Sequence, residues 1–349
     1  MQDFRAAVSQ RIITALDESA PFIDDERALS IWKEFLRPVY SLAEAGKRTR
    51  ALLVAAGCEA YAPTLSPIHA GTAVELYQLS ALAHDDIIDE SDTRRGVPAI
   101  HRSFSTSHRA MSMMGDSGSF GRKSAILAGD FLLSLAALEF ERAEHMSADA
   151  FATARKLFHE MTAETAYGQY LDFRAELTAL NDDQASAVSE ALLVVRHKSA
   201  RYSVELPLLI GAALAGATDT DLTHLSRVGR PLGIAFQLRD DELGIFGKLE
   251  DTGKPAGGDI TEGKRTVLLA LTRGMADADA VVNIDSLLGK ELSPTDVAYV
   301  QRVVTECGAY DAHEEMITRY EQEALVALTH IPSSPILHSV MEALATRRS

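Results

Sequence analysis

A long stretch without proline constrains the fold of this chain more than any other feature of its sequence. It lies between Pro98 and Pro207 and is long enough for several helices. Within it, apolar residues recur every three or four positions over 126–145 and 151–177, which is the period of a helix rather than of a strand. Alanine, leucine, glutamate and arginine dominate both segments, and all four favour helix. The stretch therefore predicts consecutive helices.

The helical period continues beyond this stretch. It governs 72–88, 185–214, 222–246 and 266–272. Pro207 and Pro231 fall within two of these segments and should kink or divide the helices there. Because no segment is typical of a run of strands, the sequence predicts an all-α chain, with residues 1–349 forming a single domain.

Three segments lack this period and are expected to be turns or loops. They are 95–100, 108–123 and 247–263, of which the second is rich in glycine, serine and methionine and the third is rich in glycine. Towards the C-terminus, Ser293 followed by Pro294 is typical of a helix start. The tail beyond is amphipathic and is expected to be helical to about residue 348.

Composition excludes several classes of function. The net charge of −16 disfavours nucleic-acid binding. Cys58 and Cys307 form no CxxC pair, which speaks against a disulfide framework or a thiolate zinc site and suits the cytoplasm. The sequence has no uninterrupted apolar segment of about 18 residues, so no membrane span is expected. An anionic ligand would therefore need a local basic cluster or bridging cations.

Acidic residues gather at the end of the segment 72–88. Asp85 and Asp89 are four residues apart, so they share one helix face and can reach one cation or a pair. Asp86 lies about 100° around the helix, and Asp92 continues the face of Asp85 if the helix persists. Buried carboxylates need a cation, and oxygen ligands without histidine or cysteine favour Mg²⁺ or Mn²⁺. The alternative is a solvated acidic helix end.

A second acidic cluster, Gln237-Leu238-Arg239-Asp240-Asp241, lies on another apolar helix pattern and strengthens the metal interpretation. Basic residues occur in small groups, several of them beside glycine. They are Lys47-Arg48-Thr49-Arg50, Arg94-Arg95, Lys198, Lys254 and Lys264-Arg265. Arginine grips phosphate oxygens bidentately, and lysine supplies a compact charge. One such pair alone would be surface solvation, but acids and bases together indicate a metal-bridged diphosphate.

In their order and spacing, these residues resemble the trans-type isoprenyl diphosphate synthases, of the geranylgeranyl and polyprenyl kind. The acids that match the family's two aspartate-rich motifs and a later position are Asp85, Asp86, Asp89, Asp240, Asp241 and Asp259. The residues that match its diphosphate-binding elements are Gly46, Lys47, Arg48, Arg50, Gln78, Arg94, Arg95, Lys254 and Lys264. The residues that match its catalytic polar positions are Gln169, Lys198, Ser199 and Gln237.

The resemblance implies a single large helical bundle around a central cavity and the transfer of an allylic group to isopentenyl diphosphate. It also implies three Mg²⁺ ions, replaceable by Mn²⁺, at Asp85, Asp89 and Asp240. By the same resemblance, carbonyl oxygens at a helix irregularity, with Gln169 and Ser199, would stabilise the allylic cation. A homodimer is expected on the same ground.

One position departs from the family's pattern. Gly244 stands where the second motif has its last aspartate, which leaves that motif one carboxylate short. Asp259 would contribute there through water, and Gly244→Asp is expected to fold and keep activity. The missing acid also supports an alternative, a non-catalytic partner subunit of another synthase. A class I terpene cyclase is a further alternative, but its [ND]xxx[ST]xxxE motif is absent because Ile245 follows Asp241 at the required spacing.

Product length is expected to depend on small residues before Asp85. Ser80 and Ala81 lie about one helical turn deeper and would let a growing chain pass. Tyr77 lies eight residues before Asp85, about 12 Å along the helix, and would form a floor suited to geranylgeranyl diphosphate. If Tyr77 packs against a neighbouring helix instead, a longer polyprenyl product follows, and a blocked tunnel would give farnesyl diphosphate.

Overall fold

The computed structural model describes residues 1–20, 25–247 and 256–345, and these residues are almost entirely helical, which confirms the all-α prediction. They group into two compact units, which are described separately. The first unit comprises 1–155, 210–217 and 334–337, and the second comprises 156–209, 218–333 and the residues from 338 on. The single domain over 1–349 stays a prediction.

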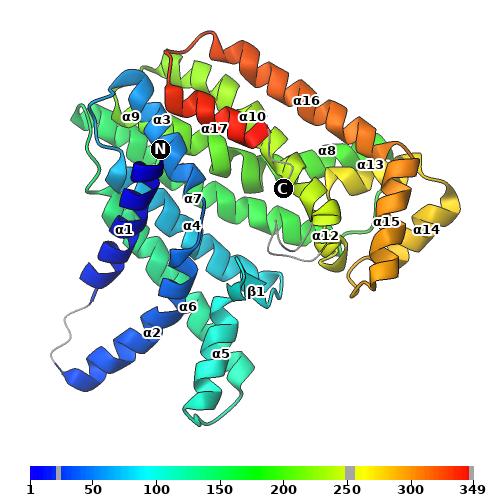
Figure 1. Ribbon diagram of the computed structural model, residues 1–349, viewed down its shortest axis with the longest axis horizontal. Coiled ribbons are helices and arrows are strands. Elements are labelled where there is room, and N and C mark those ends of the chain that lie inside the picture. Colours follow the sequence, from blue (N-terminus) through cyan, green and yellow to red (C-terminus); the bar gives the residue numbers. More distant parts are fainter. Residues whose placement is uncertain (21–24, 248–255, 346–349) are drawn as a thin grey trace. The chain divides into compact units, whose positions relative to one another are not determined.

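The first unit is built around two helices that are apolar on nearly every side. Its elements (Figure 1) are α1 (Gln2–Glu18), α2 (Glu26–Glu44), α3 (Thr49–Tyr61), α4 (Ile68–Ile88), β1 (Thr93–Arg94), β2 (Val97–Pro98), α5 (Ile100–Ala110), α6 (Ser117–Phe140), the start of α7 (Ala148–Leu177), the end of α9 (Leu206–Leu214) and the start of α17 (Pro335–Ala345). Residues 51–58 of α3 and 70–80 of α4 are all buried. A helix that is apolar all round belongs in a core, so α3 and α4 form the centre of this unit.

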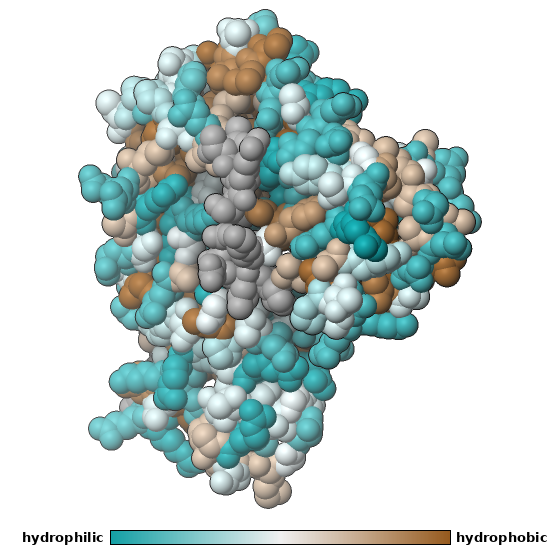
Figure 2. All heavy atoms as spheres, turned by 45° about the vertical axis from the view of Figure 1, so that its right-hand side comes forward, coloured by the Kyte–Doolittle hydropathy of each residue, from teal (hydrophilic) through white to brown (hydrophobic). Residues whose placement is uncertain are grey.

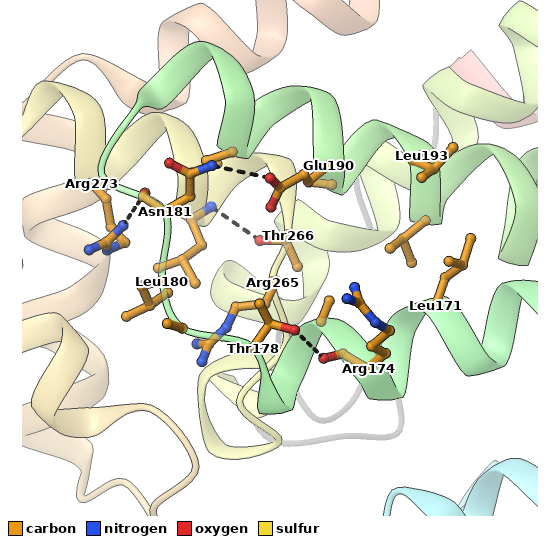
Figure 3. Close-up of a pocket in the computed structure, with 17 residues that line it drawn as sticks. Leu171, Arg174, Thr178, Leu180, Asn181, Glu190, Leu193, Arg265, Thr266 and Arg273 are labelled. Atoms are coloured by element: carbon orange, nitrogen blue, oxygen red, sulfur yellow. Dashed lines mark hydrogen bonds between the residues drawn. The ribbon is translucent and has the colours of Figure 1, made fainter.

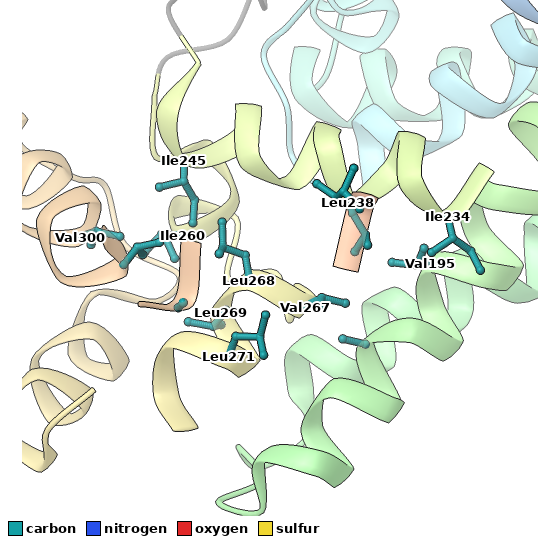
Figure 4. Close-up of a cluster of buried hydrophobic side chains, with 14 of the residues drawn as sticks. Val195, Ile234, Leu238, Ile245, Ile260, Val267, Leu268, Leu269, Leu271 and Val300 are labelled. Carbon is teal, nitrogen blue, oxygen red and sulfur yellow. The ribbon is translucent and has the colours of Figure 1, made fainter. Parts of the chain in front are cut away.

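The second unit is organised around the long helix α10. Its elements are the rest of α7, α8 (Gln184–Val194), the π-helix η1 (Val195–Glu205), the start of α9, α10 (Asp219–Phe246), α12 (Gly258–Thr261), α13 (Val267–Met275), α14 (Ala278–Leu287), α15 (Pro294–Glu306), α16 (Ala309–Leu328) and the rest of α17. α10 packs against η1 and α16. Its apolar side chains join a buried cluster in which Ile245, Ile260 and Val300 come from α10, α12 and α15 (Figure 4).

The two internal prolines behave differently from each other. α10 continues through Pro231 without a break, so this proline does not divide the helix, and the expected kink stays a prediction. Pro207 is the second residue of α9, directly after η1, so the helical stretch changes from π to α beside this proline. The period of 185–214 predicted helix but did not reveal its π-helical part.

The expected loop over 108–123 is largely wrong. α5 continues to Ala110 and α6 begins at Ser117, where the side chain of Asp116 accepts a hydrogen bond from the backbone N–H of Ser119 at 2.7 Å. A β-carbon at Gly121 would lie 2.1 Å from Oγ of Ser105. Glycine in this segment therefore allows close helix packing, whereas its composition suggested a flexible connection.

The other expected boundaries hold with changes in detail. Ser293 and Asp296 form a capping box, which confirms the predicted helix start. The tail beyond is helical as expected and forms α15, α16 and α17, and residues 346–348 of that prediction lie outside the described residues. The expected turn at 95–100 contains a small antiparallel pair, β1 and β2, in which Thr93 pairs with Pro98.

Hydrophilic residues cover much of the face seen in Figure 2, and apolar residues form separate patches on it. This distribution accords with a chain in which 24% of residues are charged. Within the described ranges, no helix has the length and apolar character needed to cross a membrane.

Candidate active site

The first acidic motif lies at the C-terminal end of α4. Asp85 and Asp86 are in the last turn, and Asp89 caps the helix with its N–H donating to the carbonyl of Asp85 at 2.8 Å. The chain then turns at Glu90, whose φ is 52°, so the helix does not persist to Asp92. The expectation that Asp92 continues the face of Asp85 is therefore wrong.

Arg94 of the hairpin returns to the acids of this motif. Its Nε donates to Oδ1 of the fully buried Asp86 at 2.7 Å, and its Nη2 donates to Oδ2 of Asp85 at 3.2 Å. Burial acts to lower the pKa of Arg94, but the charges of Asp86, Asp85 and Asp89 outweigh it and raise that pKa. Arg94, predicted to bind substrate diphosphate, is thus the counter-ion of the acids in this structure.

A second group of cations lies around Gly46. The φ of Gly46 is +146°, and a β-carbon there would lie 2.8 Å from Nη1 of Arg48 and 3.0 Å from Nη1 of Arg95. Nη1 of Arg95 also donates to the backbone carbonyl of Leu42 at 3.4 Å and to that of Ala45. Glycine at position 46 therefore lets two guanidinium groups lie beside the backbone.

This arrangement concentrates positive charge. Burial lowers the pKa of Arg95, and the charges of Arg48, Arg50 and Arg94 lower it further against the opposing effect of Glu75. Because like charges and burial both disfavour the charged state, an anion bound here would relieve the repulsion. Lys47 is exposed at the edge of the same loop.

Arg48 itself points into the protein. Only 2% of it is exposed, its Nε donates to Oγ of Ser9 at 3.0 Å, and its Nη1 lies 3.8 Å from Oε2 of Glu75. These contacts tie the loop to α1 and α4, so the structure places Arg48 where it supports the loop. Gln78, which the resemblance assigns to the diphosphate of isopentenyl diphosphate, is buried in α4.

The residues predicted to set product length lie on two faces of α4. Tyr77, Ala81 and Asp85 are spaced by four and share one face. Ser80 is on the neighbouring face, where its Oγ donates to the carbonyl of Gly129 in α6 at 2.8 Å. His84 follows Ser80 on that face, and its Nε2 would lie 2.3 Å from a β-carbon at Gly129. Ser80 and His84 therefore have packing roles against α6.

In the second unit, one face of α10 lies against η1. β-carbons at Gly229 and Gly233 would lie 2.8 Å from Cα of Glu205 and 2.3 Å from the carbonyl oxygen of Ala200. Gln237 and Asp241 continue the same four-residue spacing, so they share this face. Nε2 of Gln237 donates to Oδ1 of Asp241 at 2.8 Å.

α7 approaches η1 equally closely. A β-carbon at Gly168 would lie 2.4 Å from the backbone N and Cα of Lys198. Nζ of Lys198 forms an ion pair with Oδ2 of Asp172, one turn after Gly168. Nε2 of Gln169 is buried and has no hydrogen-bond partner among the described residues. Gln169 therefore lies beside the contact between α7 and the segment of η1 that carries Lys198 and Ser199. The resemblance predicted a helix irregularity near Gln169 and Ser199, and the π-helical backbone of η1 is such an irregularity.

The acids of the second motif repel one another. Asp241 is 5% exposed. Burial raises the pKa of Asp241 well above its usual range, and the charges of Asp259, Asp240 and Asp172 raise it further, against the hydrogen bond from Gln237. An oxygen-rich set of acids with mutual repulsion fits Mg²⁺ or Mn²⁺ in donor chemistry. In the described part of the chain, however, no three acids, histidines or cysteines are arranged to hold a metal ion, so the number of ions stays a prediction.

Two predicted lysines follow the second motif. Lys254 lies outside the described residues. Nζ of Lys264 is 2.9 Å from Oε2 of Glu262, and its backbone N–H donates to the carbonyl of Asp259 at 2.9 Å. The backbone of Lys264 is therefore hydrogen-bonded to that of Asp259, and its side chain forms an ion pair with Glu262.

A cavity of about 130 Å³ in the second unit contains none of the predicted site residues (Figure 3). Leucines and alanines of α7, α8 and α13 line it, together with Arg174, Arg265 and Arg273. Nη2 of Arg265 donates to the carbonyl of Glu176 at 3.2 Å. The sequence noted Arg265 only as the neighbour of Lys264, and the cavity itself was not predicted.

Comparison with known proteins identifies the family. Residues 33–306 match the family described as polyprenyl synthetase. The chain belongs to this family. The predicted trans-type isoprenyl diphosphate synthase family and prenyltransferase activity are therefore confirmed.

Near full-length relatives agree with this assignment. The chain is 30% identical over 346 residues to a geranylgeranyl diphosphate synthase of Methanosarcina mazei, covering 97% of this chain and 95% of the relative. It is 31% identical to a geranylfarnesyl diphosphate synthase of Aeropyrum pernix, covering 82% of this chain and 84% of that one. Among solved structures, a geranylgeranyl pyrophosphate synthase of Corynebacterium glutamicum, complexed with isoprenyl diphosphate and magnesium, is 36% identical with a TM-score of 0.87, covering 99% of this chain and 97% of that one.

Three residues that shape the site were given no role from the sequence. Asp172 is the counter-ion of Lys198, Glu75 faces the buried Arg48, and Gly233 brings α10 against η1. Only Asp172 had a local signal, since it ends the Gly168-Gln169-Tyr170-Leu171-Asp172 element one helical turn after its glycine. The other two depend on contacts between helices distant in sequence.

Proposed function

We propose that this chain makes geranylgeranyl diphosphate (C20) from isopentenyl diphosphate and an allylic diphosphate, with Mg²⁺ bound at its aspartate motifs. One observation carries the proposal: Arg94 is paired with Asp85 and Asp86 of the first motif, and Asp172, whose charge raises the pKa of Asp241 in the second motif, is paired with Lys198. The names of the relatives in Methanosarcina mazei and Corynebacterium glutamicum support the product and the metal.

The residues of the second unit serve the allylic substrate. Asp240 and Asp241 would hold Mg²⁺, which when bound would supply positive charge for the diphosphate. Lys198 adds positive charge at that diphosphate, and such groups stabilise charge that develops in the transition state. The carboxamide of Gln169 and the hydroxyl of Ser199, beside the π-helical backbone, orient the allylic cation.

The residues of the first unit serve isopentenyl diphosphate and the first metal site. Arg95 and Lys47, with Arg50 and Gln78, bind its diphosphate, and the lowered pKa of Arg95 supports an anion at that place. Asp85 and Asp89 hold Mg²⁺, with Asp86 held behind them by Arg94. Apolar helices exclude water from the cation, and released diphosphate accepts the proton.

The protein acts as a homodimer in the cytoplasm, with three Mg²⁺ ions per site. Apolar residues exposed on α6 support association of two copies, since Leu127 and Leu138 are 62% and 65% exposed. They are eleven residues apart, about three turns, and so lie on one face. Light scattering of the purified protein measures the dimer directly.

The decisive experiment uses the purified chain alone, with Mg²⁺, isopentenyl diphosphate and each of dimethylallyl, geranyl and farnesyl diphosphate. Mass analysis of the products should give geranylgeranyl diphosphate. Absence of turnover that a second synthase restores would indicate a partner subunit instead, and a cyclic hydrocarbon would indicate a cyclase. Asp85→Asn under the same conditions is the control for contaminating activity.

A further inference from the structure

Gly244 is in unusually close contact with Asp259. It lies on α10 one turn after Asp240, where the family's second motif has its last aspartate. A β-carbon built on Gly244 would lie 2.1 Å from Oδ2 and 2.6 Å from Oδ1 of Asp259. Both distances are far below the roughly 3.5–4.0 Å of an ordinary contact. The carboxylate of Asp259 therefore occupies the space that any side chain at position 244 would need.

The neighbours of both residues hold this contact in place. Ile245 follows Gly244, Ile260 follows Asp259, and both isoleucines are 1% exposed in the same apolar cluster (Figure 4). The backbone carbonyl of Ile260 accepts a hydrogen bond from the N–H of Gly289 at 2.9 Å. Asp259 is thus presented from a short helix that is anchored in the core directly after the acid.

We propose that Gly244 is a positioning residue, which lets the carboxylate of Asp259 take the place of the acid missing from the second motif. The proposal rests on the proposed function, which supplies the divalent cation for that carboxylate. α10 lacks a carboxylate at position 244, and the carboxylate of Asp259 on α12 lies against that position instead.

This arrangement changes an expectation from the sequence. Gly244→Asp was expected to fold and keep activity, because it restores the usual motif. In the structure, its β-carbon would meet Asp259, so the substitution is tolerated only if Asp259 moves away. Adding an acid at position 244 and keeping Asp259 in place are therefore mutually exclusive.

A matched control separates this role from simple packing. The control is Gly121 of α6 in the first unit, where a β-carbon would lie 2.1 Å from Oγ of Ser105 and 2.3 Å from the backbone carbonyl oxygen of His101. Gly121→Ala therefore also disturbs helix packing, but the atoms that it meets belong to a hydroxyl and a backbone carbonyl and not to a carboxylate. It should lower the thermal midpoint and leave the affinity of the protein for metal within about threefold, because an independent site does not couple to the acids.

The test measures binding of Mn²⁺ to the full chain by calorimetry, with inorganic diphosphate present and no allylic substrate. Gly244→Ala should raise the dissociation constant by roughly 10- to 100-fold, the range for losing a group that orients metal ligands. Asp259→Ala should raise the dissociation constant similarly. The double variant should bind Mn²⁺ no more weakly than the single variant with the lower affinity, because the two substitutions remove the same interaction. The combination of Gly244→Asp with Asp259→Gly should recover most of the affinity.

A folded Gly244→Ala protein with wild-type affinity, or fully additive losses in the double variant, would overturn the proposal. If Gly244→Ala does not fold, Asp259→Ala with wild-type affinity overturns it equally. The prenyltransferase assay separates this outcome from failure of the proposed function. A chain without turnover whose metal affinities still follow the expected pattern would refute the function and leave the role of Gly244 intact.

Discussion

The two acidic motifs solve the same electrostatic problem in different ways. In the first unit, Asp85 and Asp86 are compensated by Arg94, which lies less than ten residues away on a hairpin. In the second unit, burial and neighbouring acids raise the pKa of Asp241, and the nearby Lys198 is already paired with Asp172. The first motif is therefore balanced by the protein itself, whereas the second carries more repulsion and depends more on a bound cation.

Metal removal should have the largest effect. EDTA is expected to abolish turnover, and Mg²⁺ or Mn²⁺ should restore it. Asp85→Ala and Asp240→Ala should each lower turnover by roughly 100- to 1,000-fold or more, the range for losing one group that stabilises developing charge. Circular dichroism checks that the fold persists, and full activity of a metal-free preparation would refute the mechanism for both motifs.

The comparison predicts that Arg94 matters for stability as well as for activity. Arg94→Ala leaves Asp86 buried without this counter-ion, which should cost about 3–5 kcal/mol in the free energy of unfolding. Mg²⁺ should recover part of the loss. The control is Arg102→Ala, because the pair of Arg102 with Asp92 is largely exposed and should cost less than about 1 kcal/mol. Equal losses in the two variants, measured by urea unfolding, would remove the distinction between the motifs.

The cations of the first unit should act on one substrate. Arg95→Ala removes a charged donor and should raise KM for isopentenyl diphosphate by roughly 10- to 100-fold, equivalent to about 1.5–3 kcal/mol for hydrogen bonds to charged groups. KM for the allylic diphosphate should change much less. Initial rates with each substrate varied in turn test this, and a rise in the allylic constant alone would reverse the assignment.

Asp241 should give the second motif a distinctive pH dependence without metal. Its pKa is raised above 3.8 in the folded chain, so the folded state binds more protons than the unfolded state between that value and the raised pKa. Stability should therefore fall as pH rises through this window. Asp241→Asn should flatten the dependence, an effect smaller than the loss from Arg94→Ala. Unfolding curves at several pH values that match those of the wild-type protein would contradict it.

The sequence predicted what repeats along a helix and missed what depends on distant contacts. The period placed α4, α7 and α10, and the motif spacing placed Asp85 beside Asp89. It did not reveal the turn at Glu90, which separates Asp92 from the motif, or the tight packing that glycine allows at positions 121 and 233. A glycine in such a segment is compatible both with a loop and with close packing of two helices. Which of the two forms depends on the helix that packs against it, and that helix is distant in the sequence.

Changes in product length should involve the smallest differences in free energy among these predictions. They test which face of α4 the growing chain follows. Tyr77 and Ala81 share the face of Asp85, whereas Ser80 donates its hydrogen bond to Gly129 of α6. Tyr77→Ala should therefore lengthen the product beyond geranylgeranyl diphosphate, and Ala81→Phe should shorten it to farnesyl diphosphate. Ser80→Ala, the matched control, should leave the product unchanged and lower stability by about 1 kcal/mol for one lost hydrogen bond. A product that changes with Ser80 and not with Ala81, seen by mass analysis, would mean that the chain grows along the neighbouring face of α4, which contacts α6.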